Sequence, residues 1–509
     1  MMSQKFTQDQ INNVLWQACD TFRGNIDSST YKDYILVMLF IKYLSDTYKE
    51  RLTEYEERYA GDEVRIKRAL DRERFMMDEK STFDYLYDKR SSPEIGETIN
   101  KALAQIEEKN KTKLRGVFKN IDFNSEAVLG KAKERNAMLK NMLEDFAKLD
   151  LRPSKLSGDD VIGNSYEFLI SRFASDAGKK GGEFYTPSQV SELLARLVKP
   201  EVNDRIYDPT CGSGSLLIRA YQKVPNGKAQ IYGQERNGQT QALCLMNMFL
   251  HGIDDAKIAW GDTLSNPQHL EDDKLMKFQV VVANPPFSLD KWAMGFAGEG
   301  SDKQFKMEAS LDPYRRFEWG VPPASKGDFA FVLHMLHSLA EGGRMGVVLP
   351  HGVLFRGASE KKIREQIINL NLLDAVIGLP ANLFFGTGIP ATILVFKQNR
   401  DRNKILFIDA SGEGYYEKGK NQNRLREEDI QRIVDVYDRY ETVDKFSYVA
   451  AIDEIKENDY NLNIPRYVDT FEEEEQVDMD EIKENIKNIK AELEEVEAQM
   501  AKYLEELGL

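Results

Sequence analysis

Apolar positions recur at helical spacing through the first part of the chain. One set shares a single helical face: Ile11, Val14, Leu15 and Ala18. A second apolar run spans residues 34–44 and contains Lys42. It is too short to cross a bilayer and predicts a buried helix. Strand-like runs are scarce here, so we expect a helical N-terminal domain over residues 1–154.

The pattern changes after residue 153, where short apolar runs begin to alternate with helical segments. The runs that predict strands are residues 205–207, 230–233, 257–260, 278–283, 344–349, 373–379 and 391–396. This alternation is typical of an α/β fold that is doubly wound around a mostly parallel sheet. We therefore expect a Rossmann-like domain over residues 155–400, followed by a C-terminal extension over 401–470.

The last part of the chain carries a heptad repeat. Its apolar positions alternate in steps of four and three residues: Ile482, Ile486, Ile489, Leu493, Val496, Met500, Tyr503 and Leu507. Such an a/d stripe predicts a coiled-coil-like helical tail over residues 471–509. The alternative is one amphipathic helix packed on its own domain. The narrow seam favours a facing partner helix over a broad core.

A glycine-rich turn follows the first predicted strand. Residues 205–214 read as a strand and the turn Asp208-Pro-Thr-Cys-Gly-Ser-Gly214, with a helix over 215–222. Gly212 and Gly214 let the backbone approach a ligand, and the helix start presents free N–H groups. Such a turn alone could be a plain connection or a dinucleotide fingerprint. A phosphate-binding P-loop is disfavoured because no Gly-Lys-Ser/Thr follows.

Three acids stand at the ends of three successive predicted strands. Asp208 could hold the ammonium group of a methionine moiety, and Glu235 could accept from both hydroxyls of a ribose. Asp262 could accept from an adenine amino group. Each acid alone is more simply explained as a helix cap. Three of them at successive strand ends favour S-adenosylmethionine as the ligand.

The strand at residues 278–283 ends in Asn-Pro-Pro-Phe. Two prolines cannot continue a central strand, so the chain leaves the sheet at the edge where parallel folds keep their sites. The N6 amine of adenine is a poor nucleophile, and two acceptors on its N–H bonds would make its lone pair available. The Asn284 side chain and the Pro285 carbonyl supply these acceptors, and Phe287 could stack on a base swung out of a duplex. The predicted catalytic residues are Asn284, Pro285, Pro286 and Phe287. The alternative is a strand followed by a simple proline turn.

Residues 181–188, Gly-Gly-Glu-Phe-Tyr-Thr-Pro-Ser, precede the glycine turn and stand directly before a predicted helix. Taken alone, they are a helix entry capped by Thr186 or Ser188. The chemistry above needs no metal, and we find no convincing cluster of metal ligands. His334 and His337 are better explained as one face of a helix.

Composition bounds the setting and the partners. Three cysteines, Cys19, Cys211 and Cys244, form no disulfide framework and fit a reducing cytoplasm. We recognise neither a secretory signal nor a membrane span, so we expect a cytoplasmic protein. The net charge is −15, whereas a protein that grips DNA alone usually has a basic footprint. A DNA-binding chain of this charge needs a local basic face or a partner.

Residues 288–327 form a long segment with many aromatic side chains. A loop of this length is usually functional or disordered. One hypothesis is that the segment is mobile without DNA and becomes ordered around a flipped base. An ordinary packed insertion is the alternative.

The turn 208–214 and the Asn284-Pro-Pro-Phe287 motif together resemble the motifs of amino-group DNA methyltransferases. Their order, with Glu183-Phe-Tyr-Thr-Pro187 first, is similar to the N6-adenine group. The strongest resemblance is to the modification subunit of type I restriction-modification systems. It covers nearly the whole chain and rests also on Leu15-Trp16, Phe22-Arg23-Gly24, Tyr31-Lys32, Phe40-Ile-Lys-Tyr-Leu-Ser-Asp46 and Tyr460-Asn-Leu-Asn-Ile-Pro-Arg-Tyr467.

This resemblance implies an S-adenosylmethionine-dependent enzyme that methylates adenine N6 in DNA and protects host DNA from cleavage. The implied cofactor-binding residues are Glu183, Phe184, Tyr185, Thr186, Pro187, Ser188, Asp208, Thr210, Cys211, Gly212, Ser213, Gly214, Glu235 and Asp262. It also implies a specificity subunit that reads the DNA sequence, a restriction subunit, and two copies of this chain in the methyltransferase complex. The sequence agrees, because we find neither a recognition module nor the lysine loop of an ATP-driven motor.

Three other functions stay open at this point. A self-contained adenine methyltransferase is disfavoured by the acidic charge and the heptad tail. Enzymes that methylate RNA or a protein glutamine use similar Asn-Pro-Pro motifs, although the long helical N-terminus and tail favour DNA. An assembly scaffold with an inactive methyltransferase domain is disfavoured by the intact Asn284 and Glu235.

Overall fold

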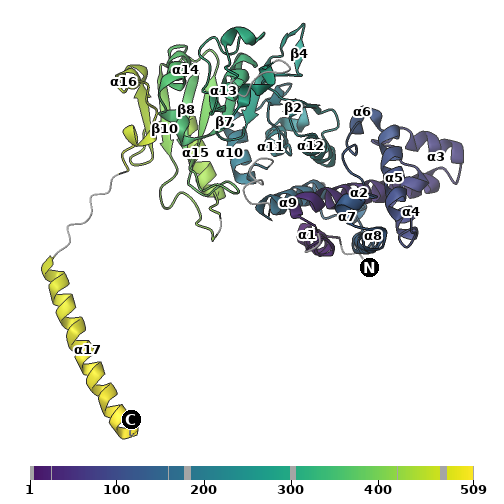
Figure 1. Ribbon diagram of the computed structural model, residues 1–509, viewed down its shortest axis with the longest axis horizontal. Helices are drawn as coiled ribbons and strands as arrows, with labels where there is room; N and C mark the ends of the chain where they lie inside the picture. The colour runs from purple at the N-terminus through teal and green to yellow at the C-terminus, as the bar shows by residue number, and fades with distance from the viewer. Residues whose placement is uncertain are drawn as a thin grey trace. The chain divides into compact units, whose positions relative to one another are not determined.

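The computed structural model describes residues 5–23, 26–158, 160–176, 185–297, 305–420, 422–470 and 479–507. The chain divides into two compact units, residues 1–468 and residues 469–509. In Figure 1 the first unit contains a group of N-terminal helices and the sheet that follows them, and the second unit contains one long helix.

Helices make up the described N-terminal part of the first unit, as predicted. They are α1 (Gln8–Ala18), α2 (Ser28–Arg58), α3 (Glu63–Leu70), α4 (Phe83–Asp88), α5 (Ile95–Lys109), α6 (Lys111–Leu114), α7 (Glu126–Leu129), α8 (Ala132–Phe146) and α9 (Val161–Asp176). α1 begins at a capping box in which the Thr7 side chain accepts from the Gln10 N–H. It buries Ile11, Leu15 and Ala18 on one face, which confirms the predicted apolar stripe.

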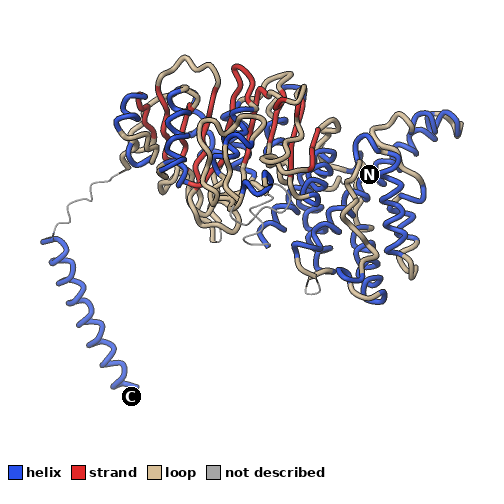
Figure 2. Tube along the Cα trace, turned by 45° about the horizontal axis from the view of Figure 1, so that its top comes forward, coloured by secondary structure: helices blue, strands red, loops and turns tan. Residues whose placement is uncertain are grey.

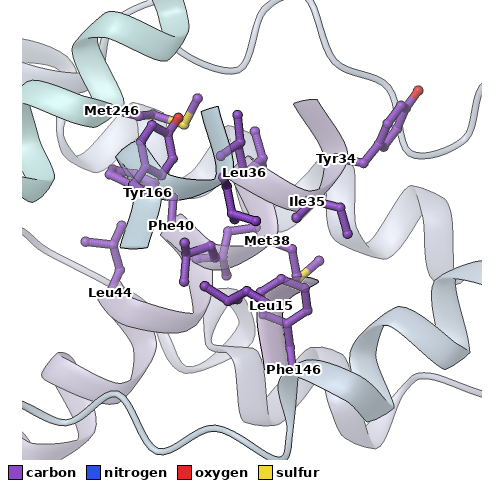
Figure 3. Close-up of a cluster of buried hydrophobic side chains, with 14 of the residues drawn as sticks. Leu15, Tyr34, Ile35, Leu36, Met38, Phe40, Leu44, Phe146, Tyr166 and Met246 are labelled. Atoms are coloured by element: carbon purple, nitrogen blue, oxygen red, sulfur yellow. The ribbon is translucent and has the colours of Figure 1, made fainter. Parts of the chain in front are cut away.

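α2 runs through the centre of this helical part. Its apolar run at residues 34–44 is buried among neighbouring helices. Figure 3 shows Leu15 of α1, Phe146 of α8, Tyr166 of α9 and Met246 of α12 (Gly238–Leu250) in the same cluster. The helical part therefore packs directly on a helix of the sheet-containing part. Within the described parts of the chain, no helix is both long and apolar enough to span a bilayer.

The described residues of the sheet-containing part form a nine-stranded sheet, drawn in red in Figure 2, in the order β11-β10-β8-β9-β7-β6-β1-β2-β3. Its strands are β1 (Arg205–Asp208), β2 (Gln230–Glu235), β3 (Lys257–Trp260), β6 (Phe278–Ala283), β7 (Leu339–Pro350), β8 (Leu373–Gly378), β9 (Ala391–Lys397), β10 (Lys404–Asp409) and β11 (Ser447–Ala451), beside a small hairpin of β4 (Leu270–Glu271) and β5 (Lys274–Leu275). The seven predicted strands are all present. β10 and β11, which the pattern did not predict, extend the same sheet beyond residue 400.

Pairing within the sheet is mostly parallel, as predicted. β9 is antiparallel to β7 and β8, and β11 is antiparallel to β10. Helices cover both faces through two separate apolar clusters. One cluster contains α13 (Asp328–His337), α14 (Ala358–Asn369) and α16 (Ile452–Glu457), and the other contains α10 (Ser188–Val198), α11 (Ser215–Gln222) and α15 (Glu427–Arg439). The doubly wound α/β fold is therefore confirmed.

The described residues of the segment 288–327 are packed into the unit. Trp292, Arg316 and Phe317 are all buried. Residues 298–304 lie outside the described residues. The packed insertion is the better interpretation for the described residues, and the hypothesis that the segment orders around DNA stays a prediction.

The second unit contains α17 (Met479–Leu507), so the predicted tail is helical over these described residues. Its described heptad side chains are exposed, from 50% for Ile486 to 64% for Ile489. An apolar stripe along a helix with little burial is the pattern expected before a partner helix covers it.

Candidate active site

The C-terminal ends of β1, β2, β3 and β6 lie at one edge of the sheet, where a cavity of about 760 Å³ is found. Doubly wound folds bind their ligands at this edge. Five predicted site residues line the cavity: Thr210, Glu235, Asp262, Asn284 and Pro286. The strand order thus brings the glycine turn, two of the acids and the Asn-Pro-Pro motif together.

Asn284 leaves the sheet directly after β6. Its side-chain Nδ2 donates to Thr186 Oγ1 at 3.2 Å. Its Oδ1 is buried and has no hydrogen-bond partner among the described residues. A buried polar atom without a partner is costly, so a donor from a ligand or a water would stabilise it. Asn284 therefore lines the cavity with an open acceptor, while Thr186 holds the other end of the amide.

The two prolines and the phenylalanine complete the motif. Pro285 is buried, and Pro286 lines the cavity. Phe287 is not among the residues that line the cavity, and its ring centroid lies 5.7 Å from that of Phe384 in an edge-to-face contact. Phe384 was not among the predicted site residues, although the aromatic pair Phe384-Phe385 before a glycine-rich loop was a usable signal.

Two glycines shape the turn after β1. Gly212 has φ +53° and Gly214 has φ +87°, in the left-handed region that favours glycine. A Cβ at Gly214 would lie 2.6 Å from Met248 Cε, so this glycine also lets α11 approach α12. Cys211 and Ser213 are buried within the turn. Cys211 and Ser213 are not among the residues that line the cavity.

Asp208 is buried at the end of β1. Its Oδ1 accepts from the Thr210 N–H at 2.9 Å, whereas its Oδ2 has no hydrogen-bond partner among the described residues. Burial raises the pKa of Asp208 to about 8, opposed by the Thr210 N–H and reinforced by the nearby Glu235. A cation placed against Oδ2 would favour the charged form and lower this pKa.

Glu235 connects the end of β2 to the glycine turn. Its carboxylate accepts from the Gly212 N–H at 3.1 Å and from the Asn237 N–H at 2.7 Å. Burial raises the pKa of Glu235. The carboxylate therefore supports the local backbone and also lines the cavity, but it is not a helix cap, because Asn237 caps α12.

Asp262 follows β3 and, like Glu235, both supports the local backbone and lines the cavity. Its Oδ1 accepts from the Leu264 and Ser265 N–H groups at 2.9 and 3.1 Å. Its Oδ2 lies 3.6 Å from Arg236 Nε, in an ion pair whose arginine is largely exposed. Oδ1 therefore supports the loop backbone, Oδ2 pairs with Arg236, and the residue lines the cavity.

The segment before α10 is divided between two places. Glu183 and Phe184 lie outside the described residues. Tyr185, Pro187 and Ser188 line a different cavity of about 230 Å³, and Thr186 contacts Asn284. The predicted cap by Thr186 or Ser188 is wrong, because Pro187 occupies the N-cap position of α10 and no side chain caps it.

The N-terminal helices also contribute to the cavity, which the sequence pattern did not predict. Thr30, Lys32 and Asp33 in the first two turns of α2 line it beside the strand-end acids. Lys32 Nζ lies 2.8 Å from Asp33 Oδ1, and burial raises the pKa of Asp33. The only signal was a pair of adjacent charges before an apolar run, far from the other motifs in sequence.

Known families match almost the whole chain. The profile described as N-6 DNA Methylase matches residues 157–476, and the profile of the HsdM N-terminal domain matches residues 11–146. The methylase subunit of the type I restriction enzyme MpnII from Mycoplasma pneumoniae is 33% identical, over 97% of this chain and 97% of its own length. The MjaVIII methylase subunit from Methanocaldococcus jannaschii is 34% identical, over 99% of this chain and 86% of its own length.

A solved structure agrees with these matches. The crystal structure of the type I restriction-modification methyltransferase subunit from Streptococcus thermophilus has a TM-score of 0.80 and 34% identity, covering 91% of this chain and 100% of that one. The resemblance that the motifs predicted is therefore confirmed over both the helical and the sheet-containing parts. The chain belongs to the family of type I restriction enzyme methylase subunits, which are adenine-specific N6 DNA methyltransferases.

Proposed function

We propose that the cavity holds S-adenosylmethionine beside a target adenine and that the residues around it transfer the methyl group to N6. Bound there, S-adenosylmethionine would supply an electrophilic methyl group on a positively charged sulfur. The observation that carries this proposal is the buried, unpartnered Asn284 Oδ1 in the same cavity as Glu235 and Asp262. An acceptor for an amine thus stands near carboxylates suited to a nucleoside.

The polar groups of the site fit this cofactor. Asp208 Oδ2 is buried without a partner and would accept from the ammonium group. Glu235 would accept from the ribose hydroxyls, and Asp262 from the amino group of the cofactor's adenine. The protein backbone from Thr210 to Gly214 would lie against the cofactor, because glycine has no side chain to prevent a close approach.

The catalytic motif would act on the amine of the target base. Asn284 Oδ1 and the Pro285 carbonyl would accept from its two N–H bonds, which favours a nitrogen with an available lone pair. These acceptors act most strongly when the nitrogen becomes tetrahedral, so they stabilise the transition state more than the bound substrate. Phe287 would stack on the base after it leaves the duplex.

We further propose that the chain acts within a larger complex. Its partners would be DNA, a specificity subunit that reads the target sequence, and a restriction subunit, with two copies of this chain in the methyltransferase complex. The net charge of −15 supports this, because phosphate neutralisation dominates DNA affinity and an acidic chain provides little of it. α17, with its exposed heptad stripe, would supply a docking element for the specificity subunit.

Replacing Glu235 with alanine should weaken S-adenosylmethionine binding by about 1–3 kcal/mol, the cost of losing a charged acceptor. Calorimetric titration of the full chain measures this loss. Glu271→Ala is the matched control, because Glu271 is an exposed glutamate that pairs with Arg205 outside the cavity. Unchanged affinity in Glu235→Ala would refute the ribose assignment.

Affinity for S-adenosylmethionine should rise with pH up to about 8. Asp208 is mostly protonated below its raised pKa in the ligand-free protein, and the ammonium group requires its charged form. Binding below that pKa therefore releases a proton, and affinity should rise by up to about tenfold per pH unit. Titrations between about pH 6 and about pH 8 measure the slope, and Asp208→Asn should flatten it. The same slope in Asp208→Asn would show that another group titrates.

A further inference from the structure

Arg316 joins the long segment 288–327 to the loop after β3. The guanidinium is fully buried and donates to the Leu264 carbonyl at 2.6 Å and to the Thr263 carbonyl at 3.3 Å. It also forms an ion pair with Asp312 at 2.7 Å. Leu264 is one of the residues whose N–H donates to Asp262. One arginine thus holds the loop in which Asp262 lies.

The same guanidinium begins a chain of side-chain hydrogen bonds. Arg316 Nη1 lies 3.0 Å from His334 Nδ1, and His334 Nε2 lies 3.1 Å from the Tyr207 hydroxyl. Thr263 Oγ1 donates to the Pro209 carbonyl at 2.5 Å. Tyr207 stands directly before Asp208 and Pro209 directly after it, so these two links reach the backbone on both sides of Asp208.

Elementary chemistry decides which group donates and which accepts in this series of hydrogen bonds. An arginine can only donate, so His334 Nδ1 must accept and the proton of the neutral ring stands on Nε2. Nε2–H then donates to the Tyr207 oxygen. Burial and the neighbouring Arg316 lower the pKa of His334 well below its usual range, so the ring stays neutral.

We infer that Arg316, His334 and Tyr207 are positioning residues, which set the relative placement of the two loops that bear Asp208 and Asp262. This inference rests on the proposed function, because it assigns the two loops to S-adenosylmethionine. This series of hydrogen bonds connects the loop after β3, through α13, to the end of β1. The loops after β1 and β3 lie on either side of Glu235, which ends β2. Losing one link should therefore weaken cofactor binding without removing any group that contacts the cofactor.

Tyr207→Phe is the sharpest test, because it removes one oxygen and keeps the ring that stacks on Phe278 at 4.3 Å. Tyr232→Phe is the matched control. Its ring packs edge-on against the same Phe278 at 5.2 Å, but its hydroxyl donates to Gln230 and takes no part in the chain. We expect Tyr207→Phe to raise the Kd for S-adenosylmethionine about tenfold, with Tyr232→Phe close to wild type. At saturating cofactor, kcat of the assembled methyltransferase should change less than about twofold.

Two substitutions of His334 separate positioning from general stability. The amide of glutamine can place a donor near the former Nε2, whereas the shorter asparagine places an acceptor near the former Nδ1. His334→Gln should therefore keep the link to Tyr207 and retain more cofactor affinity than His334→Asn. The melting temperatures of both variants are measured without ligand. Their order is then compared with the order of the affinities for S-adenosylmethionine.

The outcomes separate the inference from the proposed function. If Glu235→Ala weakens binding but Tyr207→Phe matches Tyr232→Phe, the positioning chain is overturned and the proposed function stands. If Tyr207→Phe loses affinity only in proportion to a lower melting temperature, the role is structural and the inference is again overturned. If the wild-type chain does not bind S-adenosylmethionine, or Glu235→Ala binds it as wild type does, the proposed function itself fails.

Discussion

Replacing Asn284 with alanine should lower the rate of methyl transfer by a factor on the order of 10³ and leave S-adenosylmethionine binding nearly unchanged. The substitution removes Oδ1, the buried acceptor that has no partner among the described residues. That acceptor is proposed to act on the amine of the target base and not on the cofactor. A group used mainly in the transition state lowers the rate of the chemical step and not the ground-state affinity. Single-turnover assays at saturating cofactor, beside calorimetric titration, measure the two quantities separately.

Thr186 offers a graded companion to this experiment. It accepts from the other end of the Asn284 amide, so Thr186→Val should let the amide turn and give a smaller loss of rate than Asn284→Ala. Thr186→Ser keeps the hydroxyl and should restore most of the rate. Near-normal single turnover in Asn284→Ala would refute the catalytic role. A full rate in Thr186→Val would show that Thr186 does not hold the amide in its working orientation.

Much of the sheet and its active edge could be predicted because each element has a local signal. The runs at 257–260 and 278–283 coincide with β3 and β6, since both are short apolar segments bounded by turns. Asn284 and the glycine turn were recognised for a related reason. Prolines end a strand, and glycines mark a backbone bend, so both locate the sheet edge within a few residues.

The parts that escaped prediction depend on contacts between distant residues. β11 alternates only weakly between apolar and polar residues and is specified by its antiparallel pairing with β10. The entry of Lys32 and Asp33 into the cavity depends on how α2 packs against α12, which has no local pattern. Arg316 reads as one more surface charge in a polar segment, yet it is fully buried because Asp312, His334 and two carbonyls surround it. Burial of a charge with its partners is a tertiary property.

Glutamate at both Ile489 and Val496 should abolish assembly with the specificity subunit, weakening it by roughly 100-fold or more, and leave cofactor binding intact. Both side chains lie on the exposed heptad stripe of α17, at 64% and 58% exposure. Burying such side chains in a helix–helix seam contributes about 1.5–3 kcal/mol each, and a charged replacement adds a desolvation cost. The stripe supports a docking role because an a/d seam over this length suits one facing helix. Co-purification of the substituted chain with the specificity subunit measures assembly.

A matched control on the opposite face of the same helix separates the seam from the charge. Ala491→Glu with Ala498→Glu adds the same two negative charges at the same seven-residue spacing, on positions two residues beyond Ile489 and Val496. Both alanines are exposed, so this variant should assemble as wild type does. Loss of assembly in both variants would mean that added negative charge, and not the apolar seam, blocks the partner. Full assembly of the Ile489 and Val496 variant would exclude the tail as the docking element. Loss of cofactor binding or unfolding in that variant would show instead that α17 packs on its own chain, because the catalytic sheet has a separate core that a docking element does not support.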